Sequence, residues 1–144
     1  MKRRVVEVQN HDSEIISEIQ RVHLTGRPVL VFFKEQAQMM RFFNLPDYNA
    51  FTRKTQILDE TFKANERDRK IRDTGFENQI SLMTDSFGRG TDFKISDKAA
   101  KLGGVHVIQT YLSEELADEI QVQGRTARQS AKGSYLSLIT PSDL

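Results

Sequence analysis

The sequence predicts an α/β fold built on an open, mainly parallel sheet. Segments rich in β-forming residues alternate with segments of helical hydrophobic spacing along most of the chain. The segment PVLVFF, residues 28–33, is apolar throughout, which is typical of a parallel strand buried on both faces. Parallel strands need crossover connections, and the helical segments between them would supply these.

The first predicted helix carries four apolar side chains on one face. These are Ile15, Ile16, Ile19 and Val22. We expect Asp12 or Ser13 to cap its amino end and Gly26 to stop it.

Three further helices are expected, at residues 35–43, 65–73 and 113–121. The second of these is polar and is followed by a closing glycine, Gly75. The third opens with Ser113, a capping residue, and acids follow it in the first turn, where the helix dipole favours them.

The strand segments complete the alternation. In chain order they are residues 28–33, 55–58, 79–84, 104–110 and 133–140, and the basic start MKRRVVEVQN is interpreted as a strand or arm with a solvated end. We find no repeat and no linker, so residues 1–144 are expected to form a single domain.

The composition excludes several classes of function. The chain has 144 residues, a net charge of +1 and no cysteine, so zinc–cysteine sites and thiol catalysis are ruled out. The balanced charge gives no general argument for nucleic acid or an anionic membrane. No apolar run approaches ~18 residues and the start lacks the apolar core of a signal peptide, which predicts a cytoplasmic location.

The stretch TDSFGRGTDF, residues 84–93, follows a predicted strand and ends at the sheet edge where open α/β folds bind ligands. Gly88 and Gly90 can take positive φ and let a ligand approach the backbone. Arg89 offers a planar fork of donors for phosphate or carboxylate, and Asp92 can accept from hydroxyl groups. An ordinary turn, in which Arg89 pairs with Asp85 or Asp92, explains the same residues equally well.

The segment QVQGRTARQSAKG, residues 121–133, holds a pair of arginines. Arg125 and Arg128 are three residues apart, which on a helix places both guanidinium groups on one face. Such a pair suits a polyanion such as a triphosphate. A solvated basic helix is the alternative.

Two other features receive structural interpretations. Asp59 and Glu60 follow a strand like the acids that hold Mg²⁺ in P-loop ATPases, but no Gly-Lys-Ser/Thr phosphate loop precedes them. We therefore interpret them as caps of the next helix, and the chain alone is not expected to hydrolyse ATP. His106 lies within an apolar strand and is interpreted as a core histidine, and no metal site is expected.

The segments GRGTD (88–92), LGGVHVI (102–108) and QGRTARQ (123–129), in this order, resemble the second RecA-like motor domain of SecA, the preprotein translocase ATPase of helicase superfamily 2. The resemblance covers nearly the whole chain. It departs from the family pattern at Phe87, where a small residue is usual, and at Ala127 and Ser130, where glycines are usual.

The resemblance implies a RecA-like three-layer sandwich that completes an ATP site with Mg²⁺ against a first motor domain in the same parent chain. It implies that Arg128 is an arginine finger supported by Arg125. It also implies that the loop of Gly88, Arg89, Gly90 and Asp92 lines the nucleotide, with Gln121 leading the arginine segment.

The partners implied are the first motor domain, an unfolded polypeptide and a membrane channel, with a cytoplasmic location that is peripheral to a membrane in a true SecA. Two alternatives stay open. One is the C-terminal domain of a superfamily 2 RNA or DNA helicase. The other is a SecA-like interaction domain without catalysis.

Overall fold

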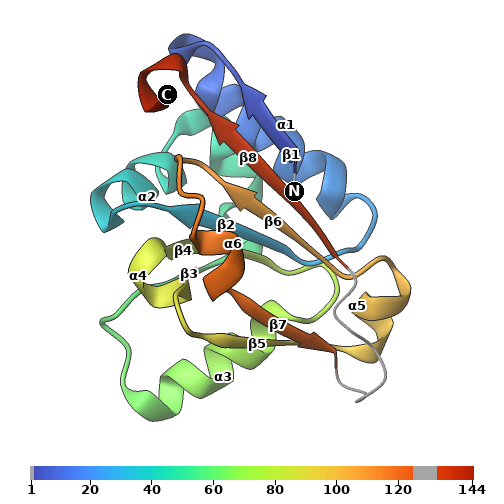
Figure 1. Ribbon diagram of the computed structural model, residues 1–144. Helices are drawn as coiled ribbons and strands as arrows, with labels where there is room; N and C mark the ends of the chain where they lie inside the picture. The colour runs from blue at the N-terminus through green and yellow to red at the C-terminus, as the bar shows by residue number, and fades with distance from the viewer. Residues whose placement is uncertain (1, 125–132) are drawn as a thin grey trace.

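The computed structural model describes residues 2–124 and 133–144, which form three layers around a central sheet (Figure 1). The sheet has six strands in the order β1-β8-β6-β2-β4-β3, and all neighbours are parallel. The strands are β1 (Lys2–Val5), β2 (Val29–Phe33), β3 (Thr55–Leu58), β4 (Ile80–Thr84), β6 (Val105–Gln109) and β8 (Gly133–Ile139). The predicted α/β class with a parallel sheet is confirmed.

Strand β2 lies at the middle of the sheet. Its five residues are all buried, because β4 and β6 flank it and helices cover both faces. Val29 lies opposite both Ile80 of β4 and His106 of β6. The apolar run that predicted this strand therefore reflects burial on both sides.

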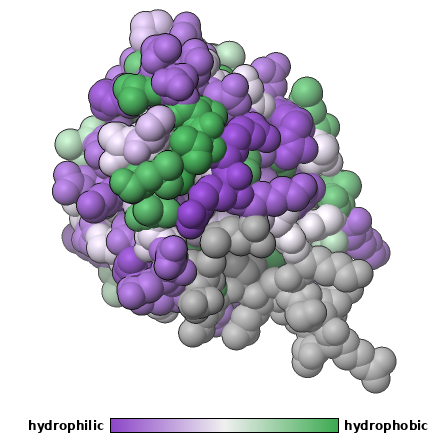
Figure 2. All heavy atoms as spheres, turned by 45° about the horizontal axis from the view of Figure 1, so that its top comes forward, coloured by the Kyte–Doolittle hydropathy of each residue, from purple (hydrophilic) through white to green (hydrophobic). Residues whose placement is uncertain are grey.

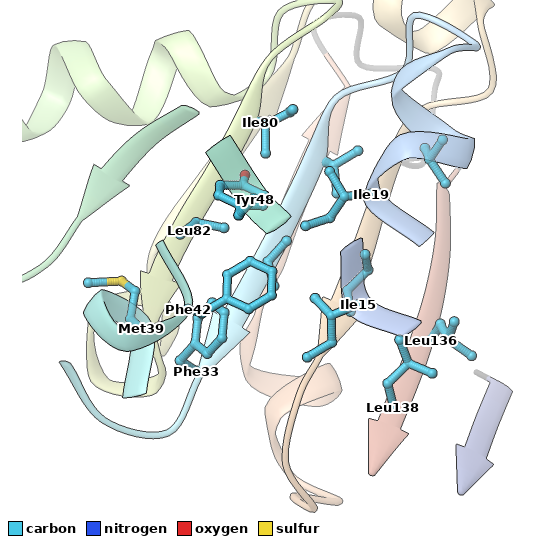
Figure 3. Packing of buried hydrophobic residues seen from close by; sticks show 14 residues of the cluster. Ile15, Ile19, Phe33, Met39, Phe42, Tyr48, Ile80, Leu82, Leu136 and Leu138 are labelled. Carbon is cyan, nitrogen blue, oxygen red and sulfur yellow. The ribbon is translucent and has the colours of Figure 1, made fainter. Parts of the chain in front are cut away.

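One face of the sheet is covered by α1 (His11–His23), α2 (Gln36–Phe43) and the 3-10 helix η2 (Pro46–Lys54). Figure 3 shows Ile15 and Ile19 of α1 facing the sheet beside the aromatic side chains of this layer. The rings of Phe42 and Tyr48 lie 4.8 Å apart between centroids. The Tyr48 hydroxyl is 2.6 Å from Thr55 Oγ1, so the buried phenol keeps a polar partner.

The start of α1 differs from the prediction. A 3-10 turn, η1 (Val8–Asn10), leads directly into the helix, whose N-cap is Asn10 without a side-chain capping bond. Asp12 and Ser13 lie inside the first turn, and the Ser13 hydroxyl donates to the Asn10 carbonyl at 2.9 Å. The prediction that either residue caps the helix is wrong, whereas Gly26, with φ of 83°, follows the helix end as expected.

The other face carries α3 (Ala64–Thr74), three short helices and a small parallel ribbon. The short helices are α4 (Asp85–Gly88), α5 (Asp97–Lys101) and α6 (Leu116–Glu119), and the ribbon pairs β5 (Asp92–Ile95) with β7 (Gln121–Gly124). Helix α3 ends at Gly75, as predicted. Ser96 caps α5 by accepting from the Ala99 amide at 3.1 Å.

The prediction of a helix at residues 113–121 is wrong. Only the single turn of α6 is helical, and Gln121–Gly124 pairs in register with β5 as a strand. The Ser113 hydroxyl does not cap α6, whose N-cap is Glu115, and it accepts a hydrogen bond from Arg89 at 3.3 Å instead. Strand β5 and helix α5 were not predicted, since they are only four and five residues long.

The surface is mostly polar. The face that Figure 2 brings forward is mainly hydrophilic, with hydrophobic residues gathered in a smaller patch, as expected for a chain with 28% charged residues. Over residues 2–124 and 133–144, none of the helices combines the length and apolar character that crossing a membrane requires.

His106 is a core histidine, as predicted, and it makes folding sensitive to acid. Its Nδ1 lies 2.5 Å from Ser134 Oγ and its Nε2 lies 3.2 Å from Glu18 Oε2. Burial lowers the pKa of His106 to about 4, whereas an unfolded chain titrates near 6.5. Between about pH 6.5 and pH 4 the histidine is protonated in the unfolded chain but neutral in the folded one. The free energy of unfolding therefore decreases as the pH falls through this range.

We expect the free energy of unfolding to drop by about 2 kcal/mol between about pH 7.5 and pH 4.5 through this residue. Urea denaturation across the range measures the drop. In His106→Gln, whose side chain does not titrate, the curve should be flatter by that amount, whatever its stability at pH 7.5. An unchanged slope in the variant would assign the acid sensitivity to other groups.

Candidate functional site

The carboxyl edge of β3 and β4 brings two loops together. The Thr84 hydroxyl donates to Glu60 Oε1 at 2.8 Å, and the Ser86 hydroxyl donates to the same oxygen. Hydrogen bonds from Ser86 and Thr84 lower the pKa of Glu60, so the carboxylate is held ionised. Thr84 also caps α4 by accepting from the Phe87 amide at 3.3 Å.

The interpretation of Asp59 and Glu60 as helix caps is therefore wrong. Helix α3 begins after Lys63 without a side-chain capping bond. Asp59 instead accepts from the Thr61 amide at 3.0 Å and from Gln36 Nε2 at 2.9 Å. The two acids fix loops at the edge of the sheet: Asp59 joins the β3 end to α2, and Glu60 joins it to the loop after β4.

The two glycines of the GRGTD segment serve different purposes. Gly88 has no positive φ; it is buried, and a Cβ there would lie 2.1 Å from Cε1 of the Phe32 ring. Gly90 has φ of 71° with nothing within 4 Å of a built Cβ, so it is needed for its backbone conformation. The expectation of positive φ holds for Gly90 only.

Arg89 is paired within the chain. Its Nε donates to Asp85 Oδ2 at 2.9 Å, its Nη1 donates to Glu119, and its Nη2 donates to Ser113 Oγ at 3.3 Å. Hydrogen bonds to Asp85 and then to Glu119 raise the pKa of Arg89. The turn interpretation, with Asp85 as partner, describes this side chain, and the same contacts tie the GRGTD loop to α6.

A buried polar network supports this loop from below. The Tyr111 hydroxyl donates to Asp85 Oδ1 at 2.6 Å, and burial followed by this bond raises the pKa of Tyr111. Gln109 is fully buried; its Nε2 donates to the carbonyl of Ser113 at 3.0 Å, and its Oε1 accepts from Tyr135. No local sequence pattern indicates these contacts, because the residues come from separate strands and the loops that follow them.

Arg67 of α3 closes the other side of the loop. Its guanidinium carbon lies 4.3 Å from the centroid of the Phe87 ring, and its Nη2 donates to Thr91 Oγ1 at 3.0 Å. Thr91 in turn donates to the carbonyl of Phe87. Phe87 belongs to the core under the loop, and it leaves open space beside the Cα of Gly90.

A cleft of about 460 Å³ lies between α3 and this loop. Its lining is Arg67, Asp68, Ile71, Arg72, Gly90, Thr91, Asp92 and Lys94. The side chain of Asp92 is exposed and makes no hydrogen bond or ion pair with any residue that the structure describes. Of the polar side chains predicted for the loop, Asp92 is thus available to a ligand, while Arg89 is engaged.

Gln121 is the last predicted site residue within the described ranges. The register of the ribbon places it directly opposite Asp92, so the backbone of the predicted glutamine lies beside the GRGTD loop. Arg125 and Arg128 lie outside the described residues. The structure therefore brings together Gly88, Arg89, Gly90, Asp92 and the backbone of Gln121.

Sequence comparisons place the chain beside SecA. It is 32% identical over 132 residues to protein translocase subunit SecA 2 of Rhodopirellula baltica and 31% identical over 134 residues to SecA of Syntrophus aciditrophicus, which covers 90% and 88% of this chain. The chain spans only 19% and 15% of the length of those relatives. No protein-family model matches the chain.

Solved structures show the same fold. Domain 2 of the DEAD-box helicase Mss116p, bound to an RNA duplex, superposes with a TM-score of 0.65 at 18% identity, covering 96% of this chain and 53% of that one. The Escherichia coli DEAD-box protein SrmB, bound to the regulator RraA, superposes with a TM-score of 0.67 at 18% identity, covering 99% and 77%.

At this identity the structural likeness establishes architecture, and the SecA likeness comes from the sequence. The sequence similarity extends along 90% of the chain, and the structure places the GRGTD loop at the carboxyl edge of a parallel sheet. Both observations indicate the same kind of domain. The chain has a RecA-like α/β fold, as the two DEAD-box structures do, and its sequence is similar to one segment of SecA.

Proposed function

We propose that this chain is the second motor domain of a SecA-like ATPase, which completes an ATP site and couples hydrolysis to protein translocation. The observation that carries the proposal is the GRGTD loop at the carboxyl edge of the sheet, with Gln121 opposite Asp92 and the Arg125–Arg128 pair following within a few residues. This order along the chain is the one expected of a domain that closes on a nucleotide held by another.

In this proposal the positive charge that acts on phosphate comes from Arg128, with Arg125 in support. A planar guanidinium placed where phosphoryl charge develops stabilises the transition state. Arg89 is a positioning residue, because its bonds to Asp85 and Glu119 fix the loop to the segment that precedes β7. Asp92 and the open space beside Gly90 would face the nucleotide.

The phosphate loop and the residues that hold Mg²⁺ would come from a first RecA-like motor domain in the same parent protein. Nucleotide bridging two domains shifts the equilibrium between open and closed arrangements, and that movement would act on an unfolded polypeptide at a membrane channel. The proposed location is cytoplasmic and peripheral to the membrane.

A nucleic-acid motor of superfamily 2 is the second candidate. Three cations, Arg67, Arg72 and Lys94, line the cleft beside the GRGTD loop, and Mss116p domain 2 is bound to an RNA duplex in its structure. This candidate requires nucleic-acid binding that weakens steeply as salt is raised.

An ATPase assay of the parent protein, with both motor domains present, separates the candidates. We expect hydrolysis that an unfolded polypeptide stimulates and single-stranded RNA does not. Stimulation by RNA alone would favour the nucleic-acid motor. Absence of hydrolysis in a parent with an intact phosphate loop would leave a SecA-like interaction domain.

A further inference from the structure

A basic groove lies at the edge of the sheet opposite the GRGTD loop, where β2, β6 and β8 begin. Its volume is about 820 Å³. Strand β8 begins at Gly133, whereas its pairing with β1 begins only at Leu136. The first residues of β8 therefore have no described partner in β1, and the groove lies beside them. Four cations contribute to its lining, and they are Lys2, Arg4, Arg21 and Arg27.

Two of these arginines are held in place by the fold. Arg21 donates from Nε and Nη2 to the buried carboxylate of Glu18, at 2.6 and 3.1 Å. Arg27 donates from Nε to the Gly104 carbonyl at 3.0 Å and from Nη2 to Ser134 Oγ at 2.6 Å. Nη1 of each arginine makes no hydrogen bond to any described residue, and a guanidinium has five N–H donors, so spare donors remain fixed in position.

The groove carries more positive charge than its carboxylates balance. Among the described residues of its lining Glu18 is the one acid, and it also accepts from His106 at 3.2 Å. Arg4 pairs with Glu14 at 3.3 Å, outside the lining, while Lys2 has no ion-pair partner among the described residues. Burial and then the charge of Arg21 lower the pKa of Arg27, while the charge of Glu18 acts in the opposite direction.

We propose that this groove binds a phosphate-type oxyanion between Arg21 and Arg27, with Lys2 as a third cation. Pre-positioned guanidinium groups with spare donors match the oxygens of a phosphoryl group in charge and geometry. The groove is wider than one phosphate, which leaves room for the group that carries it. The site is separate from the GRGTD loop and does not rest on the function proposed above.

Titration of the full 144-residue chain with inorganic pyrophosphate, at constant ionic strength and about pH 7.5, tests the site. We expect saturable shifts in the ¹H–¹⁵N spectrum at Gly104, Ser134 and Arg27 Nε, with half-saturation at about 1 mM or below. Shifts that rise linearly and are scattered over the surface would overturn the proposal.

Matched variants locate the binding. Arg21→Gln should weaken pyrophosphate binding about tenfold, because charge-assisted bonds are lost. Arg41→Gln removes a similarly exposed and paired arginine on α2, outside the groove, and should leave binding unchanged. Lys2→Gln breaks no ion pair of the described fold and should weaken binding about threefold. Equal affinity in the Arg21, Lys2 and Arg41 variants would overturn the proposal.

Competition identifies the source of the phosphate. If a single-stranded oligonucleotide displaces pyrophosphate from the groove, the natural ligand is a nucleic-acid backbone. If it does not, the ligand is a small phosphorylated molecule. Both outcomes require that pyrophosphate binds saturably in the groove. If it does not, the proposal of an oxyanion site is wrong.

Discussion

Replacing Gly75 with alanine is expected to destabilise the fold by about 3 kcal/mol or more. A Cβ at this position would lie 1.6 Å from the carbonyl oxygen of Lys94 and 2.7 Å from its carbonyl carbon. These are backbone atoms of β5, so no side-chain rotation relieves the overlap. The Ser96 amide also donates to the Gly75 carbonyl at 2.9 Å, which fixes the end of α3 against the end of β5.

The backbone conformation of Gly75 shows which effect would destabilise the Gly75→Ala variant. Its φ of −90° is open to any residue, so the whole cost of Gly75→Ala comes from the close approach of α3 and β5. Urea denaturation measures the change. Gly90→Ala is the matched control, because that site has free space but φ of 71°, and it should cost only about 1–2 kcal/mol.

The ranking of the two glycine variants decides the interpretation. Loss of a cooperative transition in Gly75→Ala counts as the predicted result, provided that Gly90→Ala still unfolds cooperatively. A Gly75→Ala protein as stable as Gly90→Ala would mean that α3 can move away from β5. The close packing proposed for this junction would then be wrong.

The sheet was predictable because its signals are local. The apolar runs at β2, β4 and β6 exceed what an exposed strand would tolerate, and each is buried in the structure. The ribbon of β5 and β7 was not predictable. Its pairing joins Asp92 to Gln121 and Ile95 to Gly124 across a long separation in sequence, and acids before Gln121 favour a helix locally.

The candidate site was predictable in position and less so in the roles of its residues. The GRGTD loop lies at the carboxyl edge because it follows a parallel strand, which the sequence pattern already indicated. Which partners satisfy Arg89 depends on the fold, because Glu119 approaches it from a distant turn. Likewise, the function of Glu60 in holding Thr84 requires β3 and β4 to be neighbours.

Replacing Arg128 with alanine is expected to abolish measurable ATP hydrolysis in a protein that contains both motor domains. The expected decrease in kcat is about 10³-fold or more. The reasoning is that a finger arginine acts on charge that develops in the transition state, so binding of ATP is little changed. Arg125→Ala is expected to abolish hydrolysis as well. Steady-state turnover measures both effects, and urea denaturation of the same variants should show unchanged folding.

Arg128→Lys separates the geometric part of this role from the charge. A lysine keeps the positive charge but loses the planar fork, so hydrolysis should recover little if two phosphoryl oxygens must be contacted together. Recovery to nearly full turnover would mean that a point charge is sufficient. Unaltered turnover in Arg128→Ala would mean that Arg128 has no role in ATP hydrolysis. The Arg125–Arg128 segment would then be a solvated basic stretch, and this domain would bind its partners without taking part in hydrolysis.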